Sequence, residues 1–281
     1  MTSVDNVAKN ALPALGTDRE ARPPSQWVFW GLTRVLPAAT FCVLLVAAWQ
    51  FMSVRLATPL VPDVAEIGRD IVRIVADGMA VKQIGITLWR ILVGFSLAFA
   101  VSLSLGILAA RSAIVRSFLE PAIVLGLTVP GLVWALLCVI WFGVSLWTAV
   151  VSIALGITPA LILNVIQGVR SVDAQVVEMA HVFRLSRAAK LRYIWIPSLV
   201  PFLFSGARLG FSLAWKVIVL VELFGLSNGV GYQLNSEFSS QNVSGVIAWT
   251  IVFWIVMSVI EYGLLQSLER RSRNWQRTSK V

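Results

Sequence analysis

The sequence predicts an all-α protein that crosses a membrane six times. Of its 281 residues, 58% are hydrophobic and only 13% are charged, and the mean hydropathy is +0.82. So few polar residues cannot cover the surface of a water-soluble protein of this size. Six segments also reach the roughly 20 apolar residues that a helix needs to cross the hydrocarbon core. These predicted spans lie near residues 33–53, 86–110, 121–142, 145–166, 199–221 and 245–268.

The positive charges agree with this count. Sixteen of the 23 lysines and arginines fall on one side of the predicted membrane, near the N-terminus, after the second and fourth spans, and after the sixth. Cytoplasmic loops carry such an excess of Lys and Arg, so both termini are predicted to be cytoplasmic. The net charge of +9 therefore indicates topology, and we predict no nucleic-acid partner.

The N-terminal part divides into a tail, a span and a surface helix. Residues 1–32 are polar and contain the run ARPPSQ, which predicts a retained cytoplasmic tail. Residues 33–80 hold the first span and then the loop VPDVAEIGRDIVRIVADG, in which apolar residues recur at helical intervals with charged residues between them. That spacing predicts an amphipathic helix on the outer, periplasmic surface.

The main transmembrane domain is predicted over residues 81–268, followed by a basic cytoplasmic tail at 269–281. In the second span Ala98, Ser102 and Gly106 are four residues apart, a spacing that lets two helices approach closely in lipid. Only FGVSLW separates the third and fourth spans, so its glycine and Ser145 must form the turn. A merged segment of about 45 residues would be too long for one span.

The loop between the fourth and fifth spans, residues 171–197, is predicted to form two short helices. Ser171 or Asp173 can cap the first helix and Ser186 the second. Pro197 disfavours helix at the preceding residue and is expected to end the loop. On the cytoplasmic side, such a segment could be a docking knob for another protein. It could equally be an interfacial helix pair whose cations meet lipid phosphates.

The motifs of common enzyme classes are absent from the sequence. His181 is the single histidine, and neither H-E-x-x-H nor G-x-S-x-G occurs. No glycine is followed by lysine, so the phosphate-binding G-x-x-x-x-G-K-[ST] loop is missing as well. The two cysteines, Cys42 and Cys138, lie in apolar runs and are interpreted as packing residues. Any energy for uphill transport must therefore enter through another chain or an ion gradient.

The segment from Glu178 to Pro197 resembles a known signature. The spacing of Glu178, Ala180, Ile194 and Pro197 is similar to the EAA motif of ABC importer permeases. Further stretches agree, namely LWRILVGF, VPGLVWALLCVIWFG, LNVIQGVRSVD and LSNGVGYQL. Over about residues 60–275 the chain resembles the inner-membrane permease subunits that serve periplasmic binding proteins for sulfonates, taurine and nitrate.

This resemblance implies a type I ABC importer permease in the inner membrane of a bacterial cell, crossing it several times. It implies a homodimer, two copies of an ATPase subunit that binds the ATP and Mg, and a periplasmic solute-binding protein. This chain would hold no cofactor and would catalyse no reaction. The resemblance also implies that residues 171–197 form the segment that couples the permease to the ATPase, and we call it the coupling segment.

Two residues of the coupling segment depart from the family pattern. Met179 stands where the family has a second alanine, a mild change because methionine adapts to irregular apolar surfaces. Arg184 stands where the family has glycine. That glycine permits a left-handed turn, which costs a non-glycine residue on the order of 1 kcal/mol. Either the turn has right-handed geometry here, or Arg184 is strained.

The fifth span carries two charges that could line a translocation pathway. Lys216 is about five residues from the outer end of the span, so its side chain could also reach the membrane surface. Glu222 is six residues further on, about 240° around the helix, so the two cannot pair directly. Each could instead pair with another helix. Asn228 and Gly229 follow, a dipeptide typical of a turn, which could be a plain outer loop or a substrate contact.

Transport of a small anionic solute by alternating access is therefore the predicted function. The alternative is a secondary transporter or channel driven by a gradient. Such a protein needs ion-coordinating groups near the middle of the membrane. Lys216 and Glu222 both lie toward one end of the fifth predicted span.

Overall fold

The computed structural model describes residues 24–265, which form helices joined by short turns. The chain divides into two compact units, Met1–Ala57 and Thr58–Val281. In the first unit, α1 runs from Pro24 to Leu56. The second unit contains α2 (Val64–Ala76), α3 (Met79–Arg111), α4 (Ala113–Thr128), α5 (Gly131–Phe142), α6 (Leu146–Arg170), α7 (Ala174–Val182), α8 (Arg187–Lys190), a π-helical segment (Leu191–Trp195), α9 (Ile196–Gly225), α10 (Val230–Ser239), α11 (Val243–Ser258) and a second π-helical segment (Val259–Leu265).

Helix α1 contains the first predicted span, residues 33–53. It begins at Pro24 and so extends into the segment predicted as a tail, of which residues 1–23 lie outside the described part of the chain. Proline suits the first turn of a helix because its missing N–H would have no partner there. Apolar side chains such as Phe41, Val43 and Leu44 are exposed over most of their surface, as lipid contact requires.

Within residues 24–265, four helical stretches are long and apolar enough to cross a membrane: Ala39–Leu56, Met79–Arg111, Leu146–Arg170 and Val243–Gly263. Two further pairs of helices, α4 with α5 and Arg187–Gly225 with α10, pass the same test but are bent by 101° and 48°. The predicted count of six spans holds if each bent pair is one span.

The third predicted span, 121–142, is wrong as a single straight helix. The chain bends between α4 and α5, where Val129 is extended, with φ −70° and ψ 124°. Pro130 causes this, because its ring excludes the helical conformation from the residue before it. The predicted turn between the third and fourth spans is confirmed: Gly143 has φ +59°, and the Ser145 hydroxyl accepts a hydrogen bond from the Thr148 N–H at the start of α6.

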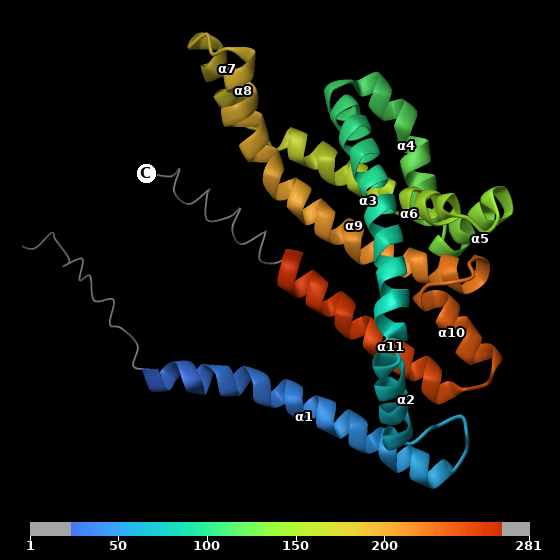
Figure 1. The fold of residues 1–281 in the computed structure, drawn as a ribbon. Helices are drawn as coiled ribbons and strands as arrows, with labels where there is room; N and C mark the ends of the chain where they lie inside the picture. The colour runs from blue at the N-terminus through green and yellow to red at the C-terminus, as the bar shows by residue number, and fades with distance from the viewer. Residues whose placement is uncertain (1–23, 266–281) are drawn as a thin grey trace, which may run out of the picture. The chain divides into compact units, whose positions relative to one another are not determined.

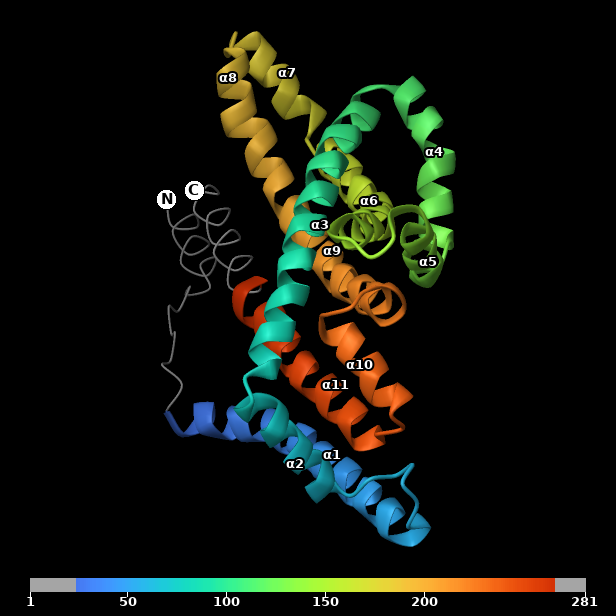
Figure 2. The same cartoon turned by 45° about the vertical axis from the view of Figure 1, so that its right-hand side comes forward.

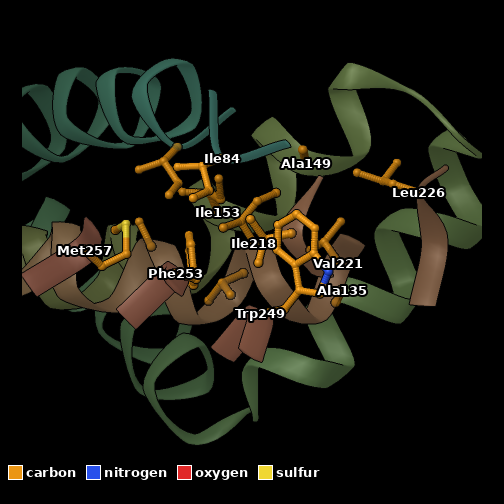
Figure 3. Packing of buried hydrophobic residues seen from close by; sticks show 14 of the residues in the cluster. Ile84, Ala135, Ala149, Ile153, Ile218, Val221, Leu226, Trp249, Phe253 and Met257 are labelled. Carbon is orange, nitrogen blue, oxygen red and sulfur yellow. The ribbon is translucent and has the colours of Figure 1, made fainter. Parts of the chain in front are cut away.

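Helices α3, α6, α9 and α11 surround the core of the second unit (Figures 1 and 2). Ile153 of α6 and Ile218 of α9 are fully buried there, and the Trp249 indole of α11 packs beside them (Figure 3). The ring of Phe253 meets the ring of Trp215 edge-on, with centroids 6.0 Å apart. Interdigitation of side chains holds helices together in lipid, where the hydrophobic effect between helices is weak.

The predicted small-residue face of the second span is confirmed. Ala98, Ser102 and Gly106 are buried on α3, which packs along α6. The Ser102 hydroxyl donates a hydrogen bond to the Thr158 carbonyl at 3.2 Å. A Cβ atom at Gly106 would overlap the Val165 side chain, so only glycine permits this close approach.

The predicted amphipathic helix is also confirmed, as α2, but it packs on protein rather than lying free on a surface. Ile67 and Ile74 are buried, and α2 lies against α11. The Ser244 hydroxyl at the start of α11 donates to the Asp70 carboxylate at 2.5 Å. Asp70 also pairs with Arg73 at 2.9 Å.

Candidate functional site

The coupling segment forms a compact helical turn at one end of the second unit, where α6 ends and α9 begins (Figures 1 and 2). Both predicted caps are present. The Asp173 carboxylate accepts from the Gln175 N–H at 2.8 Å, and the Ser186 hydroxyl accepts from the Ala189 N–H at 3.2 Å. Ser171, the alternative cap, instead donates its hydroxyl to the Gly168 carbonyl at the end of α6.

Arg184 adopts the left-handed conformation, with φ +51°, so the strained alternative is the one that occurs. The Leu185 N–H donates to the Ala180 carbonyl at 3.0 Å, and the Arg184 N–H donates to the His181 carbonyl at 2.9 Å. These two bonds form a Schellman motif, which ends a helix by satisfying its last carbonyls. The turn that the family makes with glycine is therefore made here with arginine.

The signature residues separate into buried and exposed positions. Ala180 and Ile194 are buried, with 3% and 9% of their surfaces exposed, and Pro197 is half-buried. Glu178 is exposed, and so is the adjacent Met179. The first group holds the fold of the segment, while the second is free to contact another molecule.

Exposed apolar side chains accompany Glu178 on the outside of the turn. Val182 and Phe183 expose 75% and 72% of their surfaces. Isolated apolar residues on a surface are ordinary, but a contiguous group rimmed by charge is typical of an interaction site. Arg184 and Arg187, which are also exposed, follow these residues closely in the chain.

Pro197 does not exclude helix from the residue before it, contrary to the sequence prediction. Ile196 has φ −59° and ψ −51°, which is right-handed helix, and α9 continues directly from the π-helical segment Leu191–Trp195. A π-helical turn shifts the hydrogen-bond register, so the chain can pass a proline without a break. The coupling segment is thus continuous with α9, a helix of 30 residues.

A second group of polar residues lies at the other end of α9. The Glu222 carboxylate, which is fully buried, accepts from the Arg90 guanidinium at 2.8 Å and from the Thr87 hydroxyl at 2.9 and 3.0 Å. It also accepts from the Gly231 N–H at 3.0 Å. Glu222 therefore joins α3, α9 and α10.

Side chains of α3 and α9 cap three N–H groups at the start of α10. Three successive N–H groups donate outward: that of Gly229 to the Gln83 amide oxygen at 2.8 Å, that of Val230 to the Thr87 hydroxyl at 3.0 Å, and that of Gly231 to Glu222. A carboxylate is also favoured at a helix N-terminus by the helix dipole. Gly229, at φ +103°, has the backbone conformation that only glycine adopts readily.

Arg90 completes the group by binding the loop before α10. Its guanidinium donates to the Asn228 carbonyl at 2.9 Å and to the Asn228 side-chain oxygen. We call Gln83, Thr87, Arg90, Glu222 and Asn228 the polar latch. Its members from α3 follow one another at intervals of four and three residues, which places them on one face of the helix.

Lys216 and Glu222 do not pair with each other in the structure. Their spacing along the helix predicted this. Lys216 is exposed, its Nζ lies 5.7 Å from the centre of the Trp215 ring, and none of the described residues forms an ion pair with it. For Glu222 the geometry favours structural pairing over a place on an open pathway. A pathway role for Lys216 stays a prediction.

Sequence reasoning missed Arg90 as the partner of Glu222. Three polar residues at i, i+4 and i+7 in an otherwise apolar span were a signal that one face of this helix binds something polar. Periodicity could indicate that face, but it could not identify Glu222 as the carboxylate that lies against it.

Comparison with known proteins connects these features to transport. Residues 102–274, more than half of the chain, match the model of a family described as "binding-protein-dependent transport system inner membrane component". The chain is 29% identical over 256 residues to the taurine transport system permease protein TauC of Escherichia coli (strain K12), covering 88% of this chain and 92% of that protein. It is 29% identical over 174 residues to the nitrate import permease protein NrtB of Synechocystis sp., covering 62% and 63%.

Another relative covers nearly the whole length. A Bacillus subtilis (strain 168) permease protein, SsuC, whose name assigns it provisionally to aliphatic sulfonates, is 28% identical over 273 residues, 96% of each chain. Among solved structures, a chain of the MetNI methionine ABC transporter in an inward-facing conformation superposes with a TM-score of 0.61 at 14% identity. The match covers 68% of this chain and 95% of that one, and it shows a shared fold.

Proposed function

Because this chain belongs to the family of binding-protein-dependent transport system inner membrane components, the permeases of ABC importers, we propose that it carries a small anion across the membrane. The chain is the multi-pass transport component, and ATP hydrolysis belongs to a separate subunit. The names of its relatives, which mention taurine, nitrate and aliphatic sulfonates, support a small oxyanion as the cargo.

The coupling segment is the proposed contact with the ATPase. The observation that carries this proposal is its division into an anchored inside, Ala180 and Ile194, and an exposed outside that presents Glu178, Met179 and Phe183. Since α9 continues from this segment without a break, a push on the segment would tilt a whole membrane helix. Closure of the ATPase subunits around ATP and Mg would supply that push.

The remaining parts of the mechanism follow from this assignment. Two copies of the chain would enclose the pathway, with two ATPase subunits on the cytoplasmic side and a solute-binding protein on the other. The excess of positive charge would place both termini in the cytoplasm. Alternating access would then move the anion inward, with Lys216 as a candidate contact along the pathway.

Charge reversal at Glu178 tests the coupling. With Glu178→Lys we expect the protein to reach the membrane in normal amounts, because the substitution of an exposed side chain does not disturb the fold. We expect it to lose co-purification with the ATPase subunit, because the charge at the proposed contact is reversed. Glu66→Lys, an equal change on the exposed face of α2, should leave co-purification intact. Full co-purification of the Glu178→Lys protein would refute the docking assignment.

A further inference from the structure

A depression of about 450 Å³ opens beside the polar latch, at the level where α6 begins. Lys82, Gly85, Trp89 and Arg90 of α3 line one side, and Leu146 and Asn228 line the other. A Cβ atom at Gly85 would meet nothing within 4 Å. The missing side chain of this glycine therefore leaves room in the depression.

The side chains that line the depression carry positive charge and no negative charge. Lys82 is exposed, and no carboxylate of the described residues pairs with it. No Asp or Glu is among the lining residues. The charge of Arg90 is balanced by Glu222, so the charge of Lys82 is uncompensated.

The free hydrogen-bonding capacity of the depression also consists of donors. A guanidinium has five N–H groups, of which three are used in the hydrogen bonds of Arg90 to Glu222 and Asn228. Asn228 accepts from Arg90 through its side-chain oxygen, so its NH₂ group stays available. Lys82 adds three N–H donors. An oxyanion is the ligand that such a set suits.

Arg90 is held in place before any ligand arrives. It is only 9% exposed and is fixed on two sides by Glu222 and Asn228. A donor whose side chain is already ordered loses little entropy when a ligand binds, which strengthens binding. The latch thus serves as the rigid support of the depression.

We propose that this depression is a binding site for a small oxyanion of the sulfonate or nitrate kind, with Lys82, Arg90 and Asn228 as its donors. The proposal rests on the proposed function, since the ligand would be the transported anion. The site lies at the end of α9 opposite the coupling segment, because α9 begins beside that segment and ends before Asn228. It would receive cargo on the side away from the ATPase.

Thiol labelling of the full-length protein in lipid nanodiscs tests this site without the ATPase or a transport assay. Gly85→Cys is made in a Cys42→Ser, Cys138→Ala background, since these are the native cysteines. The introduced thiolate reacts with methanethiosulfonate reagents to form a mixed disulfide and release methanesulfinate. The measured quantity is the ratio of rates for the anionic 2-sulfonatoethyl reagent and the cationic 2-(trimethylammonium)ethyl reagent.

Removing the charge of Lys82 should lower this ratio. We expect Lys82→Gln to reduce it about three- to tenfold, as one unit charge at several ångströms does in a partly screened site, and Lys82→Arg to preserve it. Arg69→Gln removes one charge from the exposed face of α2 and should leave the ratio unchanged. Nitrate or ethanesulfonate should slow labelling by the anionic reagent, while chloride at equal ionic strength should not.

A ratio that Lys82→Gln does not change overturns the proposal. So does a ratio that changes without protection by nitrate or ethanesulfonate, since it would show an electropositive surface that binds no oxyanion. These outcomes are separable from the proposed function: full co-purification of the Glu178→Lys protein, which would refute the coupling assignment, leaves the labelling ratio unaffected, and a negative labelling result leaves the coupling assignment intact.

Discussion

Arg90 and Glu222, 132 residues apart in the chain, form an ion pair with Nη1 and Oε1 2.8 Å apart. The carboxylate is fully buried and only 10% of the arginine side chain is exposed. A buried charge is tolerated only when it is paired and hydrogen-bonded. This pair satisfies that condition with the help of the Thr87 hydroxyl and the Gly231 N–H, and it ties α3 to the ends of α9 and α10.

Removal of one partner should destabilise the protein more than removal of both. Glu222→Leu leaves the Arg90 charge buried and unpaired, which costs about 3–5 kcal/mol. Arg90→Leu combined with Glu222→Leu should recover part of that loss because no lone charge remains. Thermal unfolding in detergent, followed by circular dichroism, measures both. The interpretation fails if the Glu222→Leu variant melts at the same temperature as the wild type, or if the double variant melts no higher than the Glu222→Leu variant.

Arg184→Gly should stabilise the coupling segment. The left-handed conformation of Arg184 is unfavourable for arginine but not for glycine. We therefore expect the free energy of unfolding to rise by about 1 kcal/mol. A gain of this size raises the melting temperature by roughly 2–4 °C in a chain of this size class. Arg187→Gly provides the control: this residue lies in the right-handed helix α8, where glycine is unfavourable, and its melting temperature should fall or stay the same.

Gly231→Ala and Gly68→Ala should have opposite effects, although both glycines lie in helices. A Cβ atom at Gly231 would collide with the Val219 carbonyl and the Glu222 side chain, so the substitution forces α10 away from the latch and should cost about 1–3 kcal/mol. A Cβ atom at Gly68 of α2 meets nothing within 4 Å, and alanine there should gain about 0.5–1 kcal/mol. Thermal unfolding of the two variants in the same detergent decides this; equal shifts would contradict the close approach of α10 to α9.

Gly106→Val should weaken the packing of α3 on α6. The added methyl groups would overlap the Val165 side chain, and overpacking of this kind costs about 1–3 kcal/mol. Ala100→Val makes a similar change on the exposed side of the same helix and serves as the control. A lowered melting temperature is expected for Gly106→Val alone, and similar melting of both variants would show that the α3–α6 contact tolerates separation.

Much of the fold could be predicted because its signals are local. The apolar lengths of the spans, the helical spacing of α2 and the caps Asp173 and Ser186 each depend on residues close together in the chain. The bend between α4 and α5 was missed even though Pro130 marks it. An apolar stretch of spanning length was given more weight than the backbone restriction that proline imposes.

The coupling segment shows the same division. Its position and its two helices followed from spacing and charge, and Arg184 was identified as the residue on which the turn depends. Whether Arg184 would adopt the left-handed conformation could not be predicted. The Schellman hydrogen bonds to the Ala180 and His181 carbonyls must offset the free-energy cost of that conformation. Pro197 was expected to disfavour helix at Ile196, and the π-helical turn before it depends on a hydrogen-bond register that composition does not reveal.

The sequence by itself determined that the chain is a multi-pass membrane protein, where most of its apolar helices lie and which loop carries the coupling signature, since hydrophobic length and motif spacing are properties of neighbouring residues. Only the tertiary structure decided the partner of Glu222 and the role of Arg90, and it showed the depression with its uncompensated Lys82. These features depend on which helices face each other. Close contacts such as Gly106 against Val165 and Gly231 against Glu222 decide that arrangement. The residues of each contact lie on different helices, so their positions in the sequence do not show that they meet.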